Sequence, residues 1–318
     1  MDYIKTGKSR RLIMKQFVPV NKGPVIIKEA VSSNTISDDY RNSLTIAYQF
    51  IDSVEADTSF TFCGRTLQSP IMAGPIGGQK KIMEDGQLHY ARAIREAGSA
   101  YWTDYHDINA WNAMLAEGIP GLRVIKPLAD LDEFIAEIRH DEQGGALAFA
   151  SDIDHGLTVY GTKDGQQKPF APRTAAELKQ IVQSTSLPFY LKGVMNVHDA
   201  LAAAEAGAAG IVISGHNNRF PCAVPPLKIL PAIRTAVGDR LQIFVDGGFN
   251  NGYDVFKALA LGADGVLCAR AFMAAFAKDG EDGLTNKILE MGAQLKGAMA
   301  NTGSPDLQHI NKDALILP

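Results

Sequence analysis

A histidine and an arginine follow directly on an apolar run of the chain. The run covers residues 209–213, and Ser214, His216 and Arg219 come after it. Uninterrupted apolar runs of this length are typical of strands buried in a parallel sheet, so both side chains are expected at the carboxyl end of a strand. A histidine can carry a proton near neutral pH, and a guanidinium can hold a carboxylate through two hydrogen bonds. The pair therefore indicates an active site.

A lysine ends a second apolar run. Lys192 follows residues 187–191, and this run is expected to bury the stem of the side chain. A lysine in this position can be a Schiff-base nucleophile, a phosphate ligand or a positive charge beside an electron-accepting ring. The alternative is a side chain that extends along the surface to solvent. The run before Lys192 favours a functional role.

A glycine pair after a third run predicts a phosphate site. Residues 241–245 are followed by Asp246, Gly247 and Gly248. Glycine lets the backbone approach a ligand closely, and the free N–H groups at the start of a helix bind anions. A fourth run ends just before Arg270, which would add a positive charge.

Eight apolar runs are expected to form strands, and stretches with helical periodicity such as 197–205 and 253–261 separate them. The runs are 70–73, 99–103, 122–125, 146–150, 187–191, 209–213, 241–245 and 265–268. Alternating strands and helices predict a parallel sheet, and eight such units predict an α/β protein with the TIM (β/α)8 barrel fold. Active sites of these barrels lie at the carboxyl ends of the strands, and phosphate commonly binds after strands seven and eight. The side chains expected to face one mouth are Thr103, Asp152, Lys192, His216, Asp246 and Arg270.

Bulk properties predict a soluble enzyme of 318 residues. The formal net charge of −4 and the absence of a basic stripe argue against a nucleic-acid partner. No apolar stretch has the length of a signal-peptide core or a membrane span, so no membrane association is expected. Cys63, Cys222 and Cys268 show neither metal-ligand spacing nor a disulfide framework, which favours a cytoplasmic protein without a metal. We expect residues 1–60 to be an N-terminal extension that packs on the barrel, and residues 61–318 to be the barrel with a C-terminal helix.

Three segments together resemble one enzyme family. They are 187–194 (LPFYLKGV), 206–219 (AGAAGIVISGHNNR) and 245–263 (VDGGFNNGYDVFKALALGA). In this order they resemble the FMN-dependent 2-hydroxyacid oxidases and dehydrogenases, a family that includes glycolate oxidase and lactate oxidase. The resemblance is strong from about residue 188 to 273 and fainter back to residue 70.

The resemblance implies that FMN lies across the mouth of the barrel. Lys192 would stand beside the flavin ring and stabilise the negative charge that the ring gains on reduction. The ring would lie against the backbone of residues 73–75, and the phosphate would bind after the last two strands. The residues implied in FMN binding are Ala73, Gly74, Pro75, Thr103, Lys192, Ser214, Asp246, Gly247, Gly248, Asn250, Ala269 and Arg270.

The same resemblance implies catalytic roles. His216 would be the general base that removes a proton from the substrate, while a hydride passes to the flavin and leaves a 2-oxo acid. Arg219 would hold the substrate carboxylate. Asp152 would orient His216 and stabilise its cation, and the neighbouring Asp154 could share or take over this role.

The chain also departs from the family pattern. Residues 152–157 lack the second arginine that usually holds the carboxylate, and Asn250 stands where an arginine is common. Val124 and Lys126 replace a glutamine and a tyrosine, and the N-terminal segment lacks the family's tyrosine motif. Either Lys126 or Arg123 is expected to supply the missing positive charge. Lys126 is the one that we predict to bind the substrate.

Residues 151–172 are polar and lack periodicity, which predicts a loop or a lid at the mouth. His155 within this segment is expected to be solvated and without a defined partner. His106, after the second predicted strand, is expected to stand at a helix start beside Asp107, and it is the next candidate for the base.

Three functions remain possible from sequence. The first is FMN-dependent oxidation of a lactate-like 2-hydroxy acid. The second is an FMN-dependent isomerase like the type 2 isopentenyl diphosphate isomerases, which the few cations at the mouth disfavour. The third is a barrel lyase or synthase, or a binding protein, that uses only the phosphate site. In each case the partner is a small molecule, and the resemblance implies a homo-oligomer, commonly a tetramer.

Overall fold

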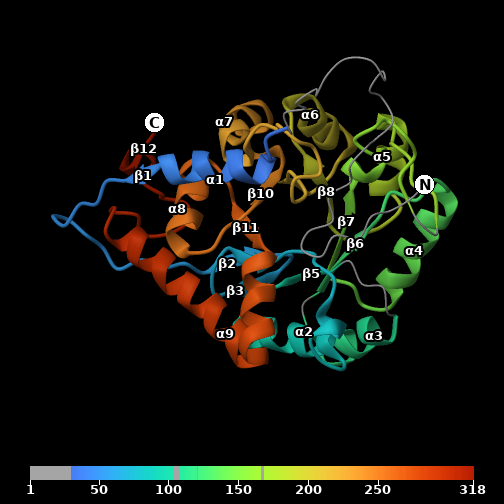
Figure 1. The fold of residues 1–318 in the computed structure, drawn as a ribbon, viewed down its shortest axis with the longest axis horizontal. Helices are drawn as coiled ribbons and strands as arrows, with labels where there is room; N and C mark the ends of the chain where they lie inside the picture. Colours follow the sequence, from blue (N-terminus) through green and yellow to red (C-terminus); the bar gives the residue numbers. More distant parts are fainter. Residues whose placement is uncertain (1–29, 104–107, 120, 166–167) are drawn as a thin grey trace, which may run out of the picture. The chain divides into compact units, whose positions relative to one another are not determined.

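A closed barrel of eight parallel strands forms the centre of the protein, seen in a computed structural model that describes residues 30–103, 108–119, 121–165 and 168–318 (Figure 1). The strands are β4 (Ile71–Ala73), β5 (Tyr101–Thr103), β6 (Gly121–Ile125), β7 (Ala148–Asp152), β8 (Phe189–Val194), β9 (Gly210–Ile213), β10 (Gln242–Asp246) and β11 (Gly265–Cys268). They follow one another in chain order around the barrel, which closes where β11 pairs with β4. The predicted TIM barrel and its eight strands are confirmed.

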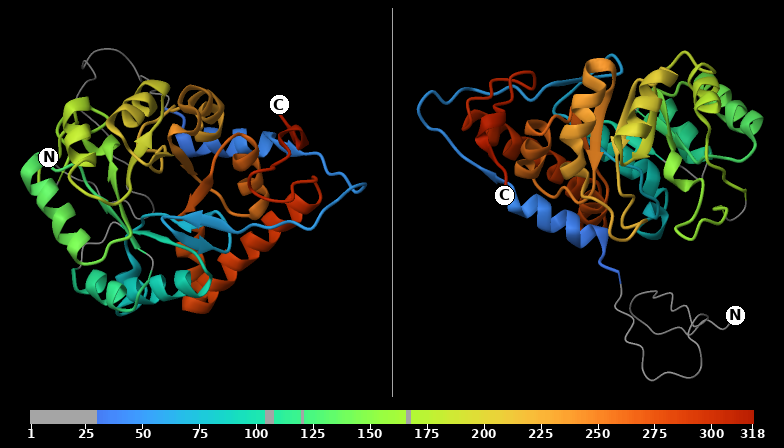
Figure 2. Two further views of the ribbon diagram at one scale, coloured as in Figure 1. Left: turned by 180° about the vertical axis from the view of Figure 1, so that it is seen from behind. Right: turned by 90° about the horizontal axis from the view of Figure 1, so that it is seen from above.

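Helices alternate with the strands and lie outside them (Figure 2). They are α2 (Gly86–Glu96), α3 (Ile108–Ala116), α4 (Leu131–Gln143), α5 (Ala175–Val182), α6 (Val197–Ala206), α7 (Pro226–Val237), α8 (Gly252–Ala260) and α9 (Arg270–Ala300). Four short 3-10 helices are η1 (Gln79–Lys81), η2 (Ile153–His155), η3 (Gly238–Arg240) and η4 (Lys312–Ala314). Local residues determine where several helices begin: Thr174 and Glu177 form a capping box at α5, and the side chain of Asn251 accepts from the N–H of Asp254 at α8.

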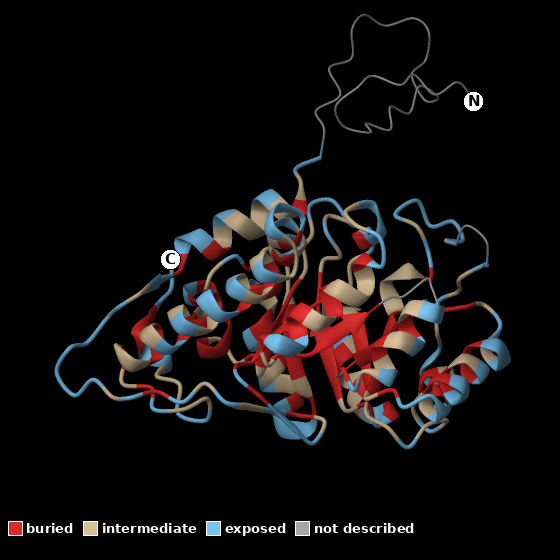
Figure 3. Ribbon diagram, turned by 90° about the horizontal axis from the view of Figure 1, so that it is seen from below, coloured by how far each residue is buried: buried red, intermediate tan, exposed pale blue. Residues whose placement is uncertain are grey.

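The barrel strands are buried on both faces, which explains why they read as continuous apolar runs (Figure 3). A short antiparallel hairpin, β2 (Phe60–Phe62) and β3 (Arg65–Leu67), contributes Phe62 to the core inside the barrel. Its ring lies 5.9 Å from that of Trp102 and 5.7 Å from that of Phe244. Aromatic side chains therefore fill the interior of the barrel, and the polar side chains that could form a site lie at the ends of the strands.

The described part of the N-terminal segment forms α1 (Ser33–Ser43) and β1 (Thr45–Ile46). Helix α1 contacts α7, and β1 pairs with β12 (Leu315–Ile316) near the C-terminus. Residues Val31–Pro318 form one compact unit. Within the described ranges, no helix has both the length and the apolar character needed to span a bilayer.

Candidate active site

The carboxyl ends of the strands bring most of the predicted residues to one cavity of about 520 Å³. Its lining includes Pro75, Lys192, His216, Asp246, Gly247, Gly248, Asn250, Ala269 and Arg270. Ala73 and Gly74 are buried where β4 ends beside it. Thr103 is buried at the end of β5, where its hydroxyl accepts a hydrogen bond of 2.9 Å from Gln87.

A buried carboxylate lies between two ammonium groups at the base of this site. The Nζ of Lys192 is 2.9 Å from Oδ1 of Asp152, and the Nζ of Lys126 is 2.5 Å from Oδ2. Burial disfavours the charged forms of both Asp152 and Lys192. For Asp152 the attraction of the two lysines is stronger than the effect of burial and holds its pKa well below the ordinary value of an aspartate. For Lys192 the carboxylates of Asp152 and Asp246 likewise overcome burial and hold its pKa above the ordinary value of a lysine. Lys192 is 2% exposed, so it is not a surface lysine.

His216 is oriented by Asp154 rather than by Asp152. Its Nδ1 lies 2.9 Å from Oδ2 of Asp154, against 3.8 Å from the nearer oxygen of Asp152. Both oxygens of Asp152 are engaged by lysines, so the expected role of Asp152 in holding His216 is corrected to a longer-range interaction. Burial would raise the pKa of Asp154, but the bond to His216 leads the interactions that lower it.

The backbone that carries His216 has an unusual shape. His216, Asn217 and Asn218 have φ angles of 45°, 53° and 64°, which place three consecutive residues in the left-handed region. Asparagine and histidine adopt this region more often than most residues, but three consecutive non-glycine residues there still cost conformational energy. Two contacts from α1 hold the turn: the N–H of Ser33 donates to Asn218 at 2.6 Å, and the amide of Asn34 donates to Asn217 at 3.0 Å.

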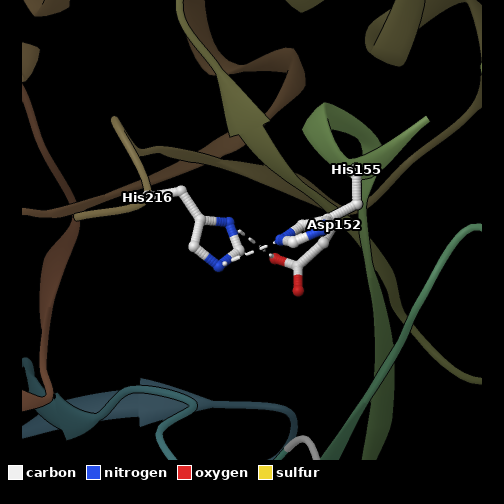
Figure 4. Close-up of side chains that lie close together, drawn as sticks. All are labelled: Asp152, His155 and His216. Atoms are coloured by element: carbon white, nitrogen blue, oxygen red, sulfur yellow. Dashed lines mark hydrogen bonds and ion pairs between the residues drawn. The ribbon is translucent and has the colours of Figure 1, made fainter. Parts of the chain in front are cut away.

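His155 lies at the site, and the prediction that it would be solvated and unpartnered is wrong. Its Nδ1 is 3.1 Å from Oδ2 of Asp164, and its Nε2 is 3.3 Å from Nε2 of His216. The two imidazoles and Asp152 lie together at the mouth (Figure 4). The residues 153–155 form η2, which turns the chain back over the end of β7 and so aims His155 inward.

Arg219 is anchored by the segment that follows β7. Its guanidinium donates to the carbonyls of Asp154 and Leu157, each at 2.8 Å, and to Oδ2 of Asp164 at 2.5 Å. The second predicted cation, Arg123, bonds to Asp141 of α4 and so faces the helix layer rather than the mouth. Lys126 remains at the site, bound to Asp152.

The other end of the cavity has the features of a phosphate cradle. Gly247 and Gly248 have φ angles of 117° and 89°, which other residues rarely adopt, and a Cβ on Gly247 would come no closer than 3.7 Å to its surroundings. The N-terminus of α9 begins at Arg270 beside them, with its first N–H groups available to an anion. Asn250 donates to the carbonyl of Gly248 at 2.8 Å and so supports the loop.

Helix α1 also supports the phosphate end. Arg41 is 5% exposed, donates to the carbonyl of Gly247 at 3.0 Å and lies 3.2 Å from Asp254 of α8. The cavity is large enough for a cofactor-sized ligand, and Gly77, which lines it, has no heavy atom within 4 Å of where a Cβ would stand. A polar cradle at one end and a buried ammonium group at the other fit a flavin mononucleotide.

Sequence reasoning missed three contributors to this site: His155, Asp164 and α1. A histidine and an aspartate in a segment without periodicity give no local sign of where they point. The charged residues of α1 lie about two hundred positions before the loops they support, so only the folded chain brings them together. His106 and Asp107 lie outside the described residues.

Comparison with known proteins identifies relatives along most of the chain. A family model described as FMN-dependent dehydrogenase matches residues 30–172 and 158–317. Glycolate oxidase 1 of Oryza sativa subsp. indica is 30% identical over 304 residues, which cover 82% of this chain and 81% of the relative. The 4-hydroxymandelate oxidase of Amycolatopsis orientalis is 29% identical over 288 residues, covering 79% and 80%. A solved structure of a mandelate oxidase variant with an FMN adduct superposes with a TM-score of 0.80 at 28% identity, covering 90% of this chain and 91% of the other.

Proposed function

The chain belongs to the FMN-dependent dehydrogenase family, and from this we infer that it is an oxidoreductase that uses FMN to oxidise a 2-hydroxy acid to the 2-oxo acid. The observation that carries the proposal is the position of two groups on one cavity. Lys192 presents a buried positive charge, and His216 presents an imidazole whose Nδ1 is held by a carboxylate. The charge of Lys192 can stabilise an anionic reduced cofactor, and the imidazole of His216 can remove a proton from the substrate.

We assign the residues to FMN as follows. The backbone after β4, with Ala73, Gly74 and Pro75, would hold the ring together with Thr103 and Ser214, and the ammonium of Lys192 would stabilise the negative charge of the reduced ring. Gly247, Gly248, Ala269 and Arg270 bind the phosphate, with Asp246 and Asn250 holding the loop. Bound FMN supplies the acceptor for the two electrons of the oxidation.

His216 acts on the substrate hydroxyl as the general base. Because Nδ1 is bonded to Asp154, the nitrogen available to the hydroxyl proton is Nε2. The carboxylates of Asp154 and Asp152, at 2.9 and 3.8 Å from Nδ1, stabilise the imidazolium that forms. Asp152 does so while it also neutralises Lys192.

We propose a lactate-like substrate, with Arg219 and Lys126 as the groups that meet its carboxylate. Both cations are already paired with aspartates, so an incoming carboxylate has to replace Asp164 or Asp152 as a partner. A diphosphate, the substrate of the isomerase alternative, would require more free cations than these two residues offer.

The test of this function is anaerobic reduction of the flavin. The purified protein should contain or take up FMN, and its visible absorption should bleach on addition of a 2-hydroxy acid such as lactate, glycolate or mandelate. A panel that varies the side chain would then define the substrate. Bound FMN that no 2-hydroxy acid reduces would reject the oxidation, and a protein that never binds FMN would reject both flavin-based functions.

Arg219→Lys should raise the apparent substrate constant by roughly tenfold or more, because lysine keeps the charge and loses the two-pronged hydrogen bond, which is worth about 1.5–3 kcal/mol. The measurement is the KM for a 2-hydroxy acid compared with that for its neutral amide. The loss should be confined to the acid. Equal losses for acid and amide would show that Arg219 serves the loop that holds it and not the substrate carboxylate.

We also propose that the protein is a cytoplasmic homo-oligomer. Large apolar side chains at exposed positions, Phe50 and Ile51 among them, offer surface that a second copy could cover. The resemblance to a family whose members are often tetramers supports the same state.

A further inference from the structure

Two imidazole rings face each other at the mouth of the barrel. The Nε2 atoms of His155 and His216 are 3.3 Å apart, and the ring centroids are 4.5 Å apart. Behind each ring stands a carboxylate: Asp164 at 3.1 Å from Nδ1 of His155, and Asp154 at 2.9 Å from Nδ1 of His216. An ionised carboxylate only accepts hydrogen bonds, and at His216 the carboxylate of Asp154 is closer to Nδ1 than the ammonium of Lys192, at 3.5 Å, so each Nδ1 is assigned the proton of its neutral ring. Both Nε2 atoms then present a lone pair to the same point.

Two lone pairs at this separation repel each other unless a cation lies between them. A metal ion would find a third ligand in Asp152, which offers a carboxylate oxygen within 4.8 Å of one ring nitrogen of each histidine. Both oxygens of Asp152, however, are already bonded to ammonium groups, those of Lys192 and Lys126. A metal would have to break these bonds and lie beside two positive charges. A proton needs no third ligand, so the arrangement favours a proton held between the two rings once His216 has taken it from the substrate.

The charges around the pair agree with one added positive charge. The carboxylates that act on the two rings are Asp152, Asp154, Asp164 and Asp246, and the cations are Lys126, Lys192 and Arg219. A single proton on the two rings brings this group close to neutrality, and a second would leave two cations in contact.

We propose that His155 is a second proton carrier of the site, and that it accepts through Nε2 the proton that His216 removes from the substrate. The proposal rests on the oxidation inferred above. In the first step the O–H bond of the substrate breaks and an N–H bond forms on Nε2 of His216. The O–H electron pair becomes part of the new carbonyl as the C–H bond at C2 breaks, and bound FMN would accept the two electrons of that bond. In the second step the proton moves to Nε2 of His155, whose side chain is 17% exposed and can release it to water.

The environment of His155 keeps its ring neutral, so that Nε2 can act as an acceptor. Burial, with Lys126 and His216 next in effect, lowers the pKa of His155 to about 4. The ring is therefore neutral at physiological pH before turnover and can accept a hydrogen bond from an imidazolium at His216. The lowered pKa also favours release of a transferred proton to water.

The test replaces His155 by phenylalanine, which keeps a ring and removes both nitrogens. Anaerobic flavin reduction by a 2-hydroxy acid would be followed from pH 5 to 9. The plateau rate should fall by roughly tenfold to a hundredfold, since a hydrogen bond to a charged group is lost. The acid limb of the pH profile should move to lower pH by about one unit or more, because the imidazolium at His216 is no longer stabilised. His155→Gln, which restores an acceptor, should recover part of both effects.

His198→Phe is the matched control, because this histidine lies on α6 with 90% of its side chain exposed. It should leave the rate and the pH profile unchanged. An unshifted acid limb in His155→Phe, even with a lower rate, would reduce His155 to a structural role and overturn the proposal. Zinc that inhibits the wild type at micromolar concentration but spares His155→Phe would show that the pair holds a metal instead.

A readout that needs no substrate separates this proposal from the oxidation itself. In ¹⁵N-histidine NMR spectra of the FMN-loaded wild type, the two Nε2 resonances should titrate together as one group, and in His155→Phe the remaining one should titrate at lower pH. Independent titration of the two rings would contradict the shared proton, whatever the enzyme oxidises. If the rings titrate together and no 2-hydroxy acid reduces the flavin, only the proposed function has failed.

Discussion

His216→Ala is expected to slow substrate-dependent flavin reduction by about two to four orders of magnitude, the range for loss of a general base. The variant should still bind FMN, because the phosphate cradle and Lys192 lie on other strands. The substitution does not relieve the left-handed backbone at residue 216, because alanine keeps the Cβ that disfavours this region. The measurement is the rate of anaerobic bleaching at saturating substrate, with FMN content determined on the same sample.

Two outcomes would change the assignment of the base. Retained reduction in His216→Ala would move the base to another group, and His155 is the nearest imidazole, at 3.3 Å. Loss of FMN together with activity would show that the turn at 216–218 is needed to form the cofactor site. His309→Ala serves as the control, since this histidine is exposed and bonds only to Asp306 among the interactions described for it.

Lys192→Met should lower the free energy of unfolding by about 3–5 kcal/mol, the usual cost of removing one partner from a buried ion pair. Asp152 is 1% exposed, and without Lys192 its Oδ1 loses its charged partner while Lys126 still binds Oδ2. The same variant should bind FMN more weakly and resist formation of the anionic reduced flavin. Urea denaturation of the FMN-free protein measures the first effect without the second.

The double variant Lys192→Met with Asp152→Asn isolates the electrostatic cause. Replacing the carboxylate by an amide removes the uncompensated charge, so stability should recover substantially towards that of the wild type. Lys278→Met, at a position whose side chain is 81% exposed, should change stability by well under about 1 kcal/mol. A Lys192→Met protein as stable as the wild type would mean that Lys126 alone is enough for Asp152.

The pH dependence of stability has a defined sign. The folded-state pKa of Asp152 is depressed, so its contribution to stability is fully present above the ordinary pKa of an aspartate and is lost as the pH falls from there through the lower folded-state pKa. Lys192→Met should flatten this acid-side loss.

The barrel was predictable because its strands are buried on both faces. Runs such as 209–213 and 241–245 then lack polar interruptions, and the polar residue that ends each run marks the mouth. Lys192, His216 and Asp246 could be placed by this argument alone, since strand ends in a parallel barrel share one rim.

The interactions within the mouth could not be predicted in the same way. Whether Asp152 or Asp154 bonds to His216 depends on the single turn of η2, which no periodic pattern marks. Arg219 pairs with Asp164, 55 residues before it, and His216 pairs with His155, 61 residues before it. All four residues lie outside the strands and the α-helices. Such contacts follow from the final packing of two loops, which local propensity does not determine.

Helix α1 contacts both the turn that carries the predicted base and the loop of the phosphate cradle. Its first residues bond to the turn that carries His216, and Arg41 in its last turn bonds to the loop of Gly247. Any change in how this helix docks therefore reaches the base and the cofactor cradle at once. By thermodynamic reciprocity, a cofactor that fixes the glycine loop also favours the docked helix and hence the strained turn. Amides of α1 should accordingly exchange more slowly with deuterium in the FMN-loaded protein than in the FMN-free one. In evolutionary terms, substitutions in α1 cannot tune cofactor affinity and base position separately, so the two properties are expected to drift together.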